Sequence, residues 1–266
     1  MDAIFDLHVH TREGSLDSDL APEHLVEAAQ RLGLKGVLLA EHDGWQRHRF
    51  QAFAAQYDLV LVHALEIYTD MGHIITLGLD GYRPGIRRLA ELRRVVEEVG
   101  GFMILAHPFR FFFGPHGRVT RNALFADPAT LPQTAADALA HPAFALVDEM
   151  EVVNGGNMDE QENRFAQEVA ARWGRPGTGG SDAHSLQGIA RGATLFHGDI
   201  RHERDLLDAL RAGAYTPLEG FNKGQVTFYG VPPVTVVTED GVTTSSRILA
   251  VHRSEEHTGS AREGCP

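Results

Sequence analysis

The 266-residue chain contains few groups that could cross-link it or anchor it in a membrane. Its single cysteine, Cys265, is the penultimate residue, which excludes a disulfide within the chain and a metal site built from several thiolates. No apolar run approaches the roughly 20 residues that cross a bilayer, so we expect no membrane-spanning segment. The N-terminus shows neither a basic leader nor a small-residue cleavage site. Together these absences favour a cytoplasmic location.

Positive charge is also scarce. The chain has 24 Lys and Arg residues against 36 Asp and Glu residues, which gives a formal net charge of −12. A protein this acidic is not expected to bind long nucleic acids, because their phosphates attract clustered cations. A single phosphate group can still be held by a local arginine. Only Lys35 and Lys223 are lysines, which bears on one class of metal site considered below.

The apolar pattern predicts alternating strands and helices. Short apolar runs bounded by Gly, Pro or charged residues are typical of buried parallel strands. Amphipathic segments lie between these runs, and one of them begins at Pro22, because proline is favoured in a first helical turn, and ends before Gly33. The other predicted helices are Ile86–Val99, Asp159–Trp173 and His202–Ala212. The predicted strands are Ala3–Leu7, Gly36–Ala40, Leu59–Leu65, Ile74–Leu79, Phe102–Ala106, Ala145–Val153 and Gly192–Phe196.

Repeated strand–helix units imply a parallel sheet, and their number favours a closed or nearly closed α/β barrel over residues 1–220. After Gly220 the pattern changes. Two runs of β-forming residues, Val231–Val237 and Val242–Val251, flank an Asp-Gly turn, which is a strong hairpin signal. We therefore expect a β-hairpin appendage over residues 221–252. Residues 253–266 are polar and aperiodic, and we expect them to be disordered.

Histidines and carboxylates follow several of the predicted strands. Functional residues of an α/β barrel lie at the C-terminal ends of its strands. Two histidines at positions i and i+2 of a strand point to the same face, so His8 and His10 can converge on one ion. Unpaired carboxylates converging in a partly buried mouth would repel one another unless cations balanced them. The sequence therefore predicts bound divalent metal ions. The residues concerned are His8, His10, His42, Glu66, His107, Asp182 and His184.

In their order along residues 3–220, these motifs resemble the PHP family, the polymerase and histidinol phosphatase superfamily. The resemblance implies a distorted (β/α)7 TIM-like barrel, two or three divalent metal ions, and hydrolysis of phosphoesters. The motifs are Asp-Leu-His8-Val-His10-Thr, Glu-His42-Asp, Leu-Glu66-Ile, Ala-His107-Pro and Gly-Ser-Asp182-Ala-His184.

The resemblance also implies a role for each motif residue. His8, His10 and Asp182 would hold a first ion, and Glu66 would bridge it to a neighbouring ion. His42 and His184 would hold a second ion. His107 would contact a third ion together with Glu66. The family's next ligand usually precedes a helix-starting proline by five residues, and Asp17 occupies that position; Asp19 and Glu13 lie close enough to compete with it.

The chain departs from the family pattern at two places. Glu41 stands where the family commonly has Asp, and we expect it to orient His42 without binding an ion itself. The third ion's remaining ligand, usually a His or Cys beyond the His-Pro motif, has no clear match. His116, His141 and Glu151 are candidates, and a surface turn is the expected place of His141. A site with two ions is therefore the more secure expectation.

The expected reaction needs no covalent nucleophile from the protein. The hypothesis is that a metal-bound hydroxide, available near neutral pH, attacks a small phosphate ester such as a nucleotide, a short oligonucleotide or an alcohol or sugar phosphate. Mixed imidazole and carboxylate ligands favour Mn, Zn or Fe over Mg. Arg110 is expected to bind a phosphate, and Asn154 to face the site. The segment Phe111–Phe113 forms either a wall that stacks on a base or sugar, or packing under the loop.

Two other classes of protein remain open. Amidohydrolase-type metallohydrolases also begin with His-x-His, but many with two ions bridge them with a carbamylated lysine. Lys35 lies at the start of its predicted strand and Lys223 lies beyond the barrel, which argues against that version. A non-catalytic metal-binding regulatory module would be expected to have lost ligands, whereas the principal ones are present here. The sequence indicates neither the substrate nor the oligomeric state.

Overall fold

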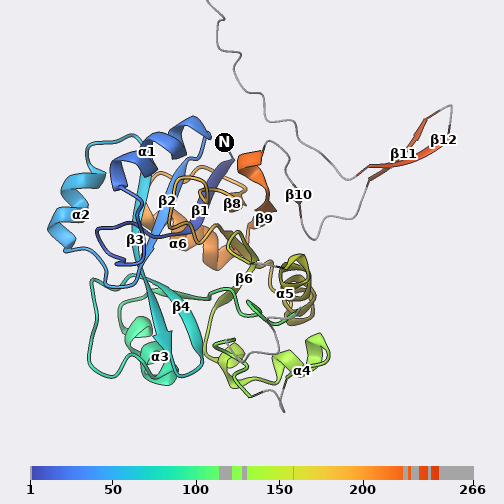
Figure 1. The fold of residues 1–266 in the computed structure, drawn as a ribbon, viewed down its shortest axis with the longest axis horizontal. Coiled ribbons are helices and arrows are strands. Elements are labelled where there is room, and N and C mark those ends of the chain that lie inside the picture. Colours follow the sequence, from blue (N-terminus) through green and yellow to red (C-terminus); the bar gives the residue numbers. More distant parts are fainter. Residues whose placement is uncertain are drawn as a thin grey trace, which may run out of the picture.

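The computed structural model describes residues 2–113, 122–127, 131–157 and 159–223, and the backbone of three further strands between 227 and 245. The described residues form a ten-stranded sheet in the order β10-β9-β8-β1-β2-β3-β4-β5-β6-β7, with helices packed around it (Figure 1). Its strands are β1 Ala3–Val9, β2 Gly36–Glu41, β3 Val60–Thr69, β4 Gly72–Leu77, β5 Phe102–Leu105, β6 Glu149–Asn154, β7 Thr178–Gly180, β8 Gly192–Phe196, β9 Tyr215–Glu219 and β10 Thr227–Phe228.

The sheet curls until its β7 edge returns to β1. A parallel bridge joins Val9 at the end of β1 to Ala183 just after β7. The His10 backbone N–H donates to the Ala183 carbonyl at 3.0 Å, and the Asp182 N–H donates to the His8 carbonyl at 2.7 Å. These bonds close the sheet at the end where the predicted metal ligands lie, and the predicted barrel is confirmed.

The prediction of a parallel sheet was only partly right. The pairs β1–β2, β2–β3, β5–β6 and β6–β7 are parallel, whereas β3–β4, β4–β5, β1–β8 and β8–β9 are antiparallel. The link between β3 and β4 is only Asp70 and Met71, which is too short for the crossover that parallel strands require. The apolar-run criterion also missed β7 and β9, because β7 is only Thr-Gly-Gly and β9 contains a proline.

The four predicted helices are present with slightly different ends, and two more were not predicted. Helix α1 (Pro22–Arg31) buries Leu25, Val26 and Ala29, which is the apolar face expected from the sequence. The unpredicted helices, α2 (Arg47–Ala54) and α4 (Ala135–Leu139), are short. The described helices are α1 Pro22–Arg31, α2 Arg47–Ala54, α3 Leu89–Glu98, α4 Ala135–Leu139, α5 Glu160–Trp173 and α6 Glu203–Ala212, with 3₁₀ turns η2 Pro142–Ala145 and η3 Phe221–Lys223.

Beyond the barrel, β11 (Val234–Thr238) pairs antiparallel with β12 (Gly241–Ser245). The predicted hairpin pairing is therefore present over these residues. The remaining parts of the two predicted strands, the two residues between β11 and β12, and residues 253–266 lie outside the described residues. The division into a barrel, a hairpin and a disordered tail stays a prediction.

Asp6 fixes the closing seam of the barrel from inside. One of its carboxylate oxygens, Oδ1, accepts from the backbone N–H groups of Ser181 at 2.8 Å and His8 at 3.2 Å. The other oxygen accepts from the Ala190 N–H at 2.8 Å. Burial raises the pKa of Asp6 to about 6 despite these bonds. The side chain thus ties β1 to the segments after β7, which is where two i, i+2 pairs of site residues meet.

A buried tyrosine–glutamate pair lies in the core. The Tyr215 hydroxyl donates to Glu149 Oε2 at 2.6 Å, and burial raises the pKa of Glu149. A raised pKa means that the stability contributed by Glu149 is present below its usual pKa of 4.5 and is lost as pH rises through the folded pKa. The hydroxyl limits this loss, because it stabilises the ionised carboxylate.

We therefore expect Tyr215→Phe to lower the free energy of unfolding by about 1.5–3 kcal/mol at pH 8, and by less at pH 5. Urea unfolding with a chelator present, so that metal binding does not contribute, measures both values. Tyr57→Phe, at a partly buried tyrosine, is the control. A deficit that is equal at the two pH values would contradict this account of Glu149.

Candidate metal centre

Seven of the predicted site residues gather at one end of the barrel. His8 and His10 lie near the end of β1, His42 follows β2, and Glu66 lies in β3. His107 follows β5, and the remaining two residues follow β7. Their side chains form three groups in which the donor atoms lie within 4.8 Å of one another. The groups are His8–His10–Asp182, His10–His42–His184 and His8–Glu66–His107.

Glu66 is the hub of this cluster. Its Oε1 lies 2.9 Å from His107 Nε2 and 2.9 Å from His73 Nδ1. Its Oε2 faces three other rings, at 3.3 Å from His42 Nδ1, 3.5 Å from His10 Nε2 and 3.6 Å from His8 Nε2. Burial would raise the pKa of Glu66, but the surrounding histidines, His8 first, outweigh it and hold the pKa well below its usual value. Glu66 is therefore an ionised carboxylate placed between all parts of the cluster.

His8, His10 and Asp182 form the deepest group. His8 Nε2 and His10 Nε2 lie 3.0 Å apart, and Asp182 Oδ1 lies 3.1 Å from His10 Nε2 and 3.5 Å from His8 Nε2. Both histidines are fully buried. Burial would lower the pKa of His8, but nearby carboxylates, led by Glu151, raise it well above its usual value. In the metal-free chain His8 therefore holds a proton that a bound cation would displace.

His42, His184 and Asp17 form a more open group at the mouth. Asp17 Oδ2 lies 3.3 Å from His42 Nε2 and 3.4 Å from His184 Nε2. Of the two competing acids, Glu13 pairs instead with Arg49 at 2.9 Å, and Asp19 is an exposed neighbour whose backbone N–H bonds the His184 carbonyl. The loop geometry therefore favours Asp17 over both alternatives.

The donor set fits divalent cations. Imidazole nitrogens and carboxylate oxygens bind such ions at about 2.0–2.2 Å, so donors on one ion lie roughly 3–4 Å apart. The nitrogen–nitrogen and nitrogen–oxygen distances within His8–His10–Asp182 are of this size. Two buried imidazole nitrogens 3.0 Å apart also have no better common partner than a proton or a cation. The residues present can therefore hold the ions that the sequence predicts.

His73 is a cluster residue that the sequence analysis missed. It is the second residue of β4, it is 28% exposed, and its ring lies 5.1 Å from that of His107. The rule that predicts the site applies to the C-terminal ends of strands, which meet at one edge when strands are parallel. Because β4 runs antiparallel to β3, its N-terminal end lies beside the C-terminal end of β3. An apolar run with a histidine at its start, after a two-residue turn, is the signal that could have found it.

Two site residues have backbone angles that are rare for non-glycine residues. His107 has φ 29° and Asp182 has φ 53°. Such conformations cost of order 1–3 kcal/mol and persist where the surrounding structure enforces them. Here the Glu151 carboxylate accepts from the His107 N–H at 2.8 Å, and the His8 carbonyl accepts from the Asp182 N–H at 2.7 Å. The fold holds both side chains in the cluster at the expense of local strain.

Glu151 and Glu41 lie just outside the cluster, and each is hydrogen-bonded to its histidines directly or through Ser15. Glu151 was a candidate for the third ion, but its Oε1 bonds His8 Nδ1 at 2.9 Å, on the ring edge away from the other donors. Glu41 was expected to orient His42. It accepts from the Ser15 hydroxyl at 2.7 Å. Ser15 Oγ in turn lies 3.1 Å from His10 Nδ1 and accepts from the His42 backbone N–H at 3.0 Å. Through Ser15, Glu41 is therefore linked both to the His10 ring and to the His42 backbone.

His141, the second candidate for the third ion, has a hydrogen bond and a packing contact of its own. The His141 side chain accepts from the Ala143 N–H as the N-cap of η2, and its ring packs on Phe125. This is the surface-turn role that the sequence indicated. His116 lies outside the described residues.

The two predicted substrate-binding residues lie at the edge of the cluster and contact each other. Arg110 Nη2 donates to Asp182 Oδ2 and, at 2.6 Å, to Asn154 Oδ1. Asn154 is buried, and its Nδ2 donates to Glu151 Oε2 at 2.9 Å. Arg110 is 21% exposed and so borders solvent, whereas Asn154 holds Arg110 and Glu151 in place. The arrangement makes Arg110 the cation closest to the cluster for an incoming anion among the described residues.

No helix in the part of the chain that the structure describes has the length and apolar character needed to cross a membrane. A family model described as PHP-associated matches residues 160–215. The error-prone DNA polymerase of Mycolicibacterium paratuberculosis is 27% identical over 243 residues, which cover 81% of this chain and 22% of the polymerase. The chain thus spans about a fifth of the length of this curated relative.

Two solved structures share the fold. One is a two-domain protein from Bacteroides vulgatus described as containing a predicted PHP-like metal-dependent phosphoesterase. It matches with a TM-score of 0.57 at 18% identity, over 90% of this chain and 77% of that chain. The other is the lesion-specific endonuclease PfuEndoQ from Pyrococcus furiosus, with a TM-score of 0.53 at 15% identity, over 80% of this chain and 56% of that chain. At these identities the likeness establishes the fold alone.

Proposed function

The chain belongs to the PHP superfamily, and from this premise we propose that it is a metal-dependent phosphoesterase that hydrolyses a small phosphate ester. The observation that carries the proposal is the convergence of five histidines on the single carboxylate of Glu66. A buried carboxylate and neutral imidazoles are the ligands that Mn, Zn and Fe share, and two or three such ions fit the three groups of donors.

The ligand assignment is part of this proposal. His8, His10 and Asp182 would hold the first ion, and the mouth group of Asp17, His42 and His184 would hold the second. His107 and His73 would hold the third. Glu66, whose two oxygens face different groups, would be shared between them. His73 takes the place of the ligand that the sequence lacked after the His-Pro motif, because its Nδ1 reaches the same Glu66 oxygen as His107 does.

When bound, divalent ions supply Lewis acidity toward phosphoryl oxygens and activate water near neutral pH. The protein's own groups orient the histidine ligands and the phosphate. Glu151 orients the His8 ring through its Nδ1, and Ser15 orients His10 in the same way. Arg110 borders the cluster at the solvent side and can donate to a phosphoryl oxygen with the nitrogens that Asp182 and Asn154 leave free.

The negative net charge of the chain favours a small substrate over a long nucleic acid. The chain has a net charge of −12, so a long phosphate backbone would be repelled except at the metal site. A curated relative is a DNA polymerase and a structural neighbour is an endonuclease, which keeps nucleotides and short oligonucleotides among the candidates. An amidohydrolase with a bridging carbamylated lysine has less support, because Lys35 immediately precedes β2, at the opposite end of the barrel from the cluster.

The test is elemental analysis of the purified protein together with hydrolysis of a generic aryl phosphate, with and without added Mn. We expect two or three ions per chain and turnover that a chelator abolishes. Bound metal without turnover of phosphate mono- or diesters would move the assignment to amide substrates or to a non-catalytic metal-binding module. A folded protein that binds no metal would overturn the proposal.

The third-ion assignment gives a separate prediction. We expect His73→Ala to lower the metal content by one ion per chain, because His107 and Glu66 alone leave too few protein donors for a stable site. The protein should stay folded, since His73 is 28% exposed. His63→Ala, a partly buried histidine on β3 outside the cluster, is the control. Unchanged metal content in His73→Ala would remove His73 from the ligand set.

A further inference from the structure

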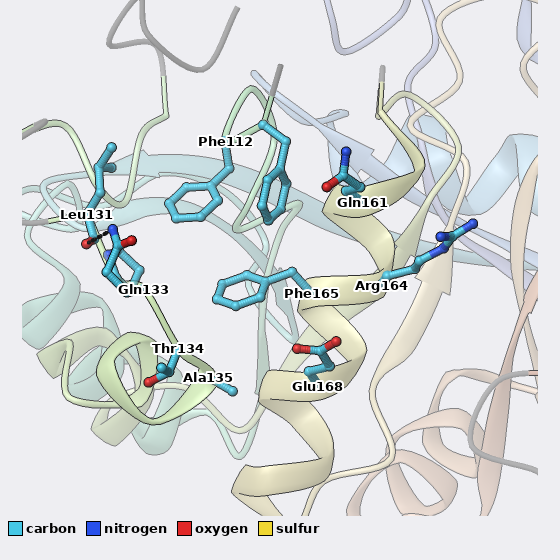
Figure 2. Close-up of a pocket in the computed structure, with 11 residues that line it drawn as sticks. Phe112, Leu131, Gln133, Thr134, Ala135, Gln161, Arg164, Phe165 and Glu168 are labelled. Carbon is cyan, nitrogen blue, oxygen red and sulfur yellow. Dashed lines mark hydrogen bonds between the residues drawn. The ribbon is translucent and has the colours of Figure 1, made fainter. Parts of the chain in front are cut away.

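The loop that follows β5, residues 107–112, carries two of the site residues. His107 at its start is a member of the metal cluster, and Arg110 borders that cluster on the solvent side. At its end, Phe112 lies beside Phe165 of α5, with ring centroids 5.5 Å apart (Figure 2). The backbone angle φ is 29° at His107 and 61° at Phe111, so strained residues stand on both sides of Arg110. Such angles persist where neighbouring groups enforce them.

A buried asparagine that no sequence motif indicated holds this stretch of the loop. Asn122 is 7% exposed, and its Nδ2 donates to the carbonyls of Pro108 at 2.8 Å and Arg110 at 2.9 Å. Its Oδ1 accepts from the backbone N–H groups of Leu124 at 2.9 Å and Phe125 at 2.7 Å. Both donors and both acceptor positions of the amide are used, and all four bonds go to backbone groups. One side chain thus fixes the Arg110 backbone to a separate segment of the chain.

His107 is held by other groups. Its backbone N–H donates to Glu151 at 2.8 Å, and its ring lies 2.9 Å from Glu66. The Arg110 backbone, by contrast, is bonded through its N–H to the His107 carbonyl at 3.1 Å and through its carbonyl to Asn122. Loss of the Asn122 bonds is therefore expected to displace Arg110 and to leave the metal ligand in place.

Packing alone does not fix the loop beside Arg110. A small cavity of about 130 Å³ adjoins it, and Asn122, Arg110, Phe111 and His73 are among the residues that line this cavity. Side chains therefore leave room into which the loop can move. The amide bonds of Asn122 supply the restraint that packing does not, and their removal would shift the loop while the barrel stays intact.

The guanidinium of Arg110 is held on one edge only. Nη2 donates to Asp182 and Asn154, and Nε donates to Asn157 Oδ1 at 3.5 Å. Nη1 has no hydrogen bond to any residue that the structure describes, and the side chain is 21% exposed. An arginine with two nitrogens fixed and one left over is pre-organised to donate to an anion. This direction is kept only while the backbone of Arg110 is fixed as well.

We propose that Asn122 is a positioning residue of the phosphate site, because it holds the backbone of Arg110 where the guanidinium can donate to a phosphoryl oxygen at the metal centre. This inference rests on the proposed function and adds a residue outside the metal cluster to it. The four bonds of Asn122 go to none of the metal-ligand candidates, so its effect has to pass through Arg110. Substitutions at two residues that act as one unit are not additive, which makes the proposal testable.

The experiment compares Asn122→Asp, Asn122→Ala, Arg110→Ala and the two double variants, all loaded with Mn. Asp keeps the shape and both acceptor bonds but loses the donors to the Pro108 and Arg110 carbonyls, and Ala loses them without adding charge. We expect each Asn122 variant to raise KM for an aryl phosphate by about tenfold, the lower end for a lost hydrogen bond to a charged group, with kcat and metal content little changed. In the Arg110→Ala background neither should raise KM further. Asn222→Asp is the matched control, because its amide donates to the Ile189 carbonyl at 2.8 Å, away from this loop.

Titration of the same Mn-loaded proteins with inorganic phosphate separates this inference from the proposed function. If no ester is hydrolysed but phosphate binds, and Asn122→Ala weakens that binding about tenfold only when Arg110 is present, the positioning role stands without the phosphoesterase activity. If esters are hydrolysed and both Asn122 variants keep the unaltered KM, the positioning role is wrong and the phosphoesterase proposal stands. Equal losses with and without Arg110, a fall in metal content, or no binding of phosphate to the unaltered protein would each overturn the role of Asn122.

Discussion

Replacing Glu66 by Gln is expected to lower kcat/KM for any phosphoester substrate by at least about a thousandfold and to release at least one metal ion per chain. The two oxygens of Glu66 face histidines of all three donor groups. An amide keeps the shape of the side chain, but it has one oxygen instead of two and no charge. It therefore cannot bridge two ions, and its NH₂ group faces histidine nitrogens that must be unprotonated to bind metal.

Elemental analysis and turnover are measured on the same preparation of Glu66→Gln. Glu13→Gln is the control, because Glu13 lies near the mouth but pairs with Arg49 outside the cluster. The fold of the variant can be checked by circular dichroism, since the substitution is isosteric. Full activity with a full complement of ions would show that Glu66 is not a bridging ligand and would remove the observation on which the proposed function depends.

The sequence predicted most of the site because one physical rule governs where its residues lie. In a barrel, strand C-termini meet at one end, so the polar residues near the C-terminal ends of β1, β2, β3, β5 and β7 were expected to converge. The structure brings together the histidines and acids that this rule selected. His73 was missed for the same reason, because it precedes an antiparallel strand to which the rule does not apply. The metal-ligand roles stay a prediction until ions are measured.

Other features depend on loop geometry that residue types do not encode. Asp17, Asp19 and Glu13 are acids within one loop, and only the folded loop shows that Asp17 Oδ2 lies between His42 and His184. Glu41 and Glu151 are both buried glutamates on strands, and the partners that each one orients follow from the direction of the side chain. The mixed strand directions were also missed, because an apolar run has the same appearance in a parallel and an antiparallel pair.

The apolar composition of the segment Phe111–Phe113 left two roles open for it. The sequence allowed either a wall that stacks on a base or sugar, or packing under the loop. Phe112 packs on buried Phe109, with ring centroids 5.7 Å apart, so the packing is observed and stacking on a substrate stays a prediction. Phe112 also stacks on Phe165 of α5, more than 45 residues later, a contact that no local pattern could have indicated.

Glu151→Gln is expected to weaken metal binding by about 10- to 100-fold without removing any ligand. This is the effect typical of groups that hydrogen-bond to a metal ligand and orient it, with about the same 10- to 100-fold range. Glu151 accepts from His8 Nδ1 at 2.9 Å, from the His107 N–H at 2.8 Å and from Asn154 Nδ2 at 2.9 Å. Burial would raise the pKa of Glu151, but the neighbouring His8 ring outweighs burial and lowers it, so the group is an ionised acceptor of three bonds.

An amide in this place has only one acceptor oxygen. Its NH₂ group must face either His8 Nδ1 or the strained His107 backbone, and in both cases a donor meets a donor. If it faces His8, the ring must carry its proton on Nε2, which then cannot bind the ion. Titration of the metal-free protein with Mn measures the affinity, and raising the pH should not restore it, because a fixed NH₂ group does not titrate. Glu162→Gln, on α5, is the control for substituting a buried glutamate. If Glu151→Gln binds Mn as tightly as the unaltered protein, orientation of His8 by Glu151 contributes nothing to the metal centre.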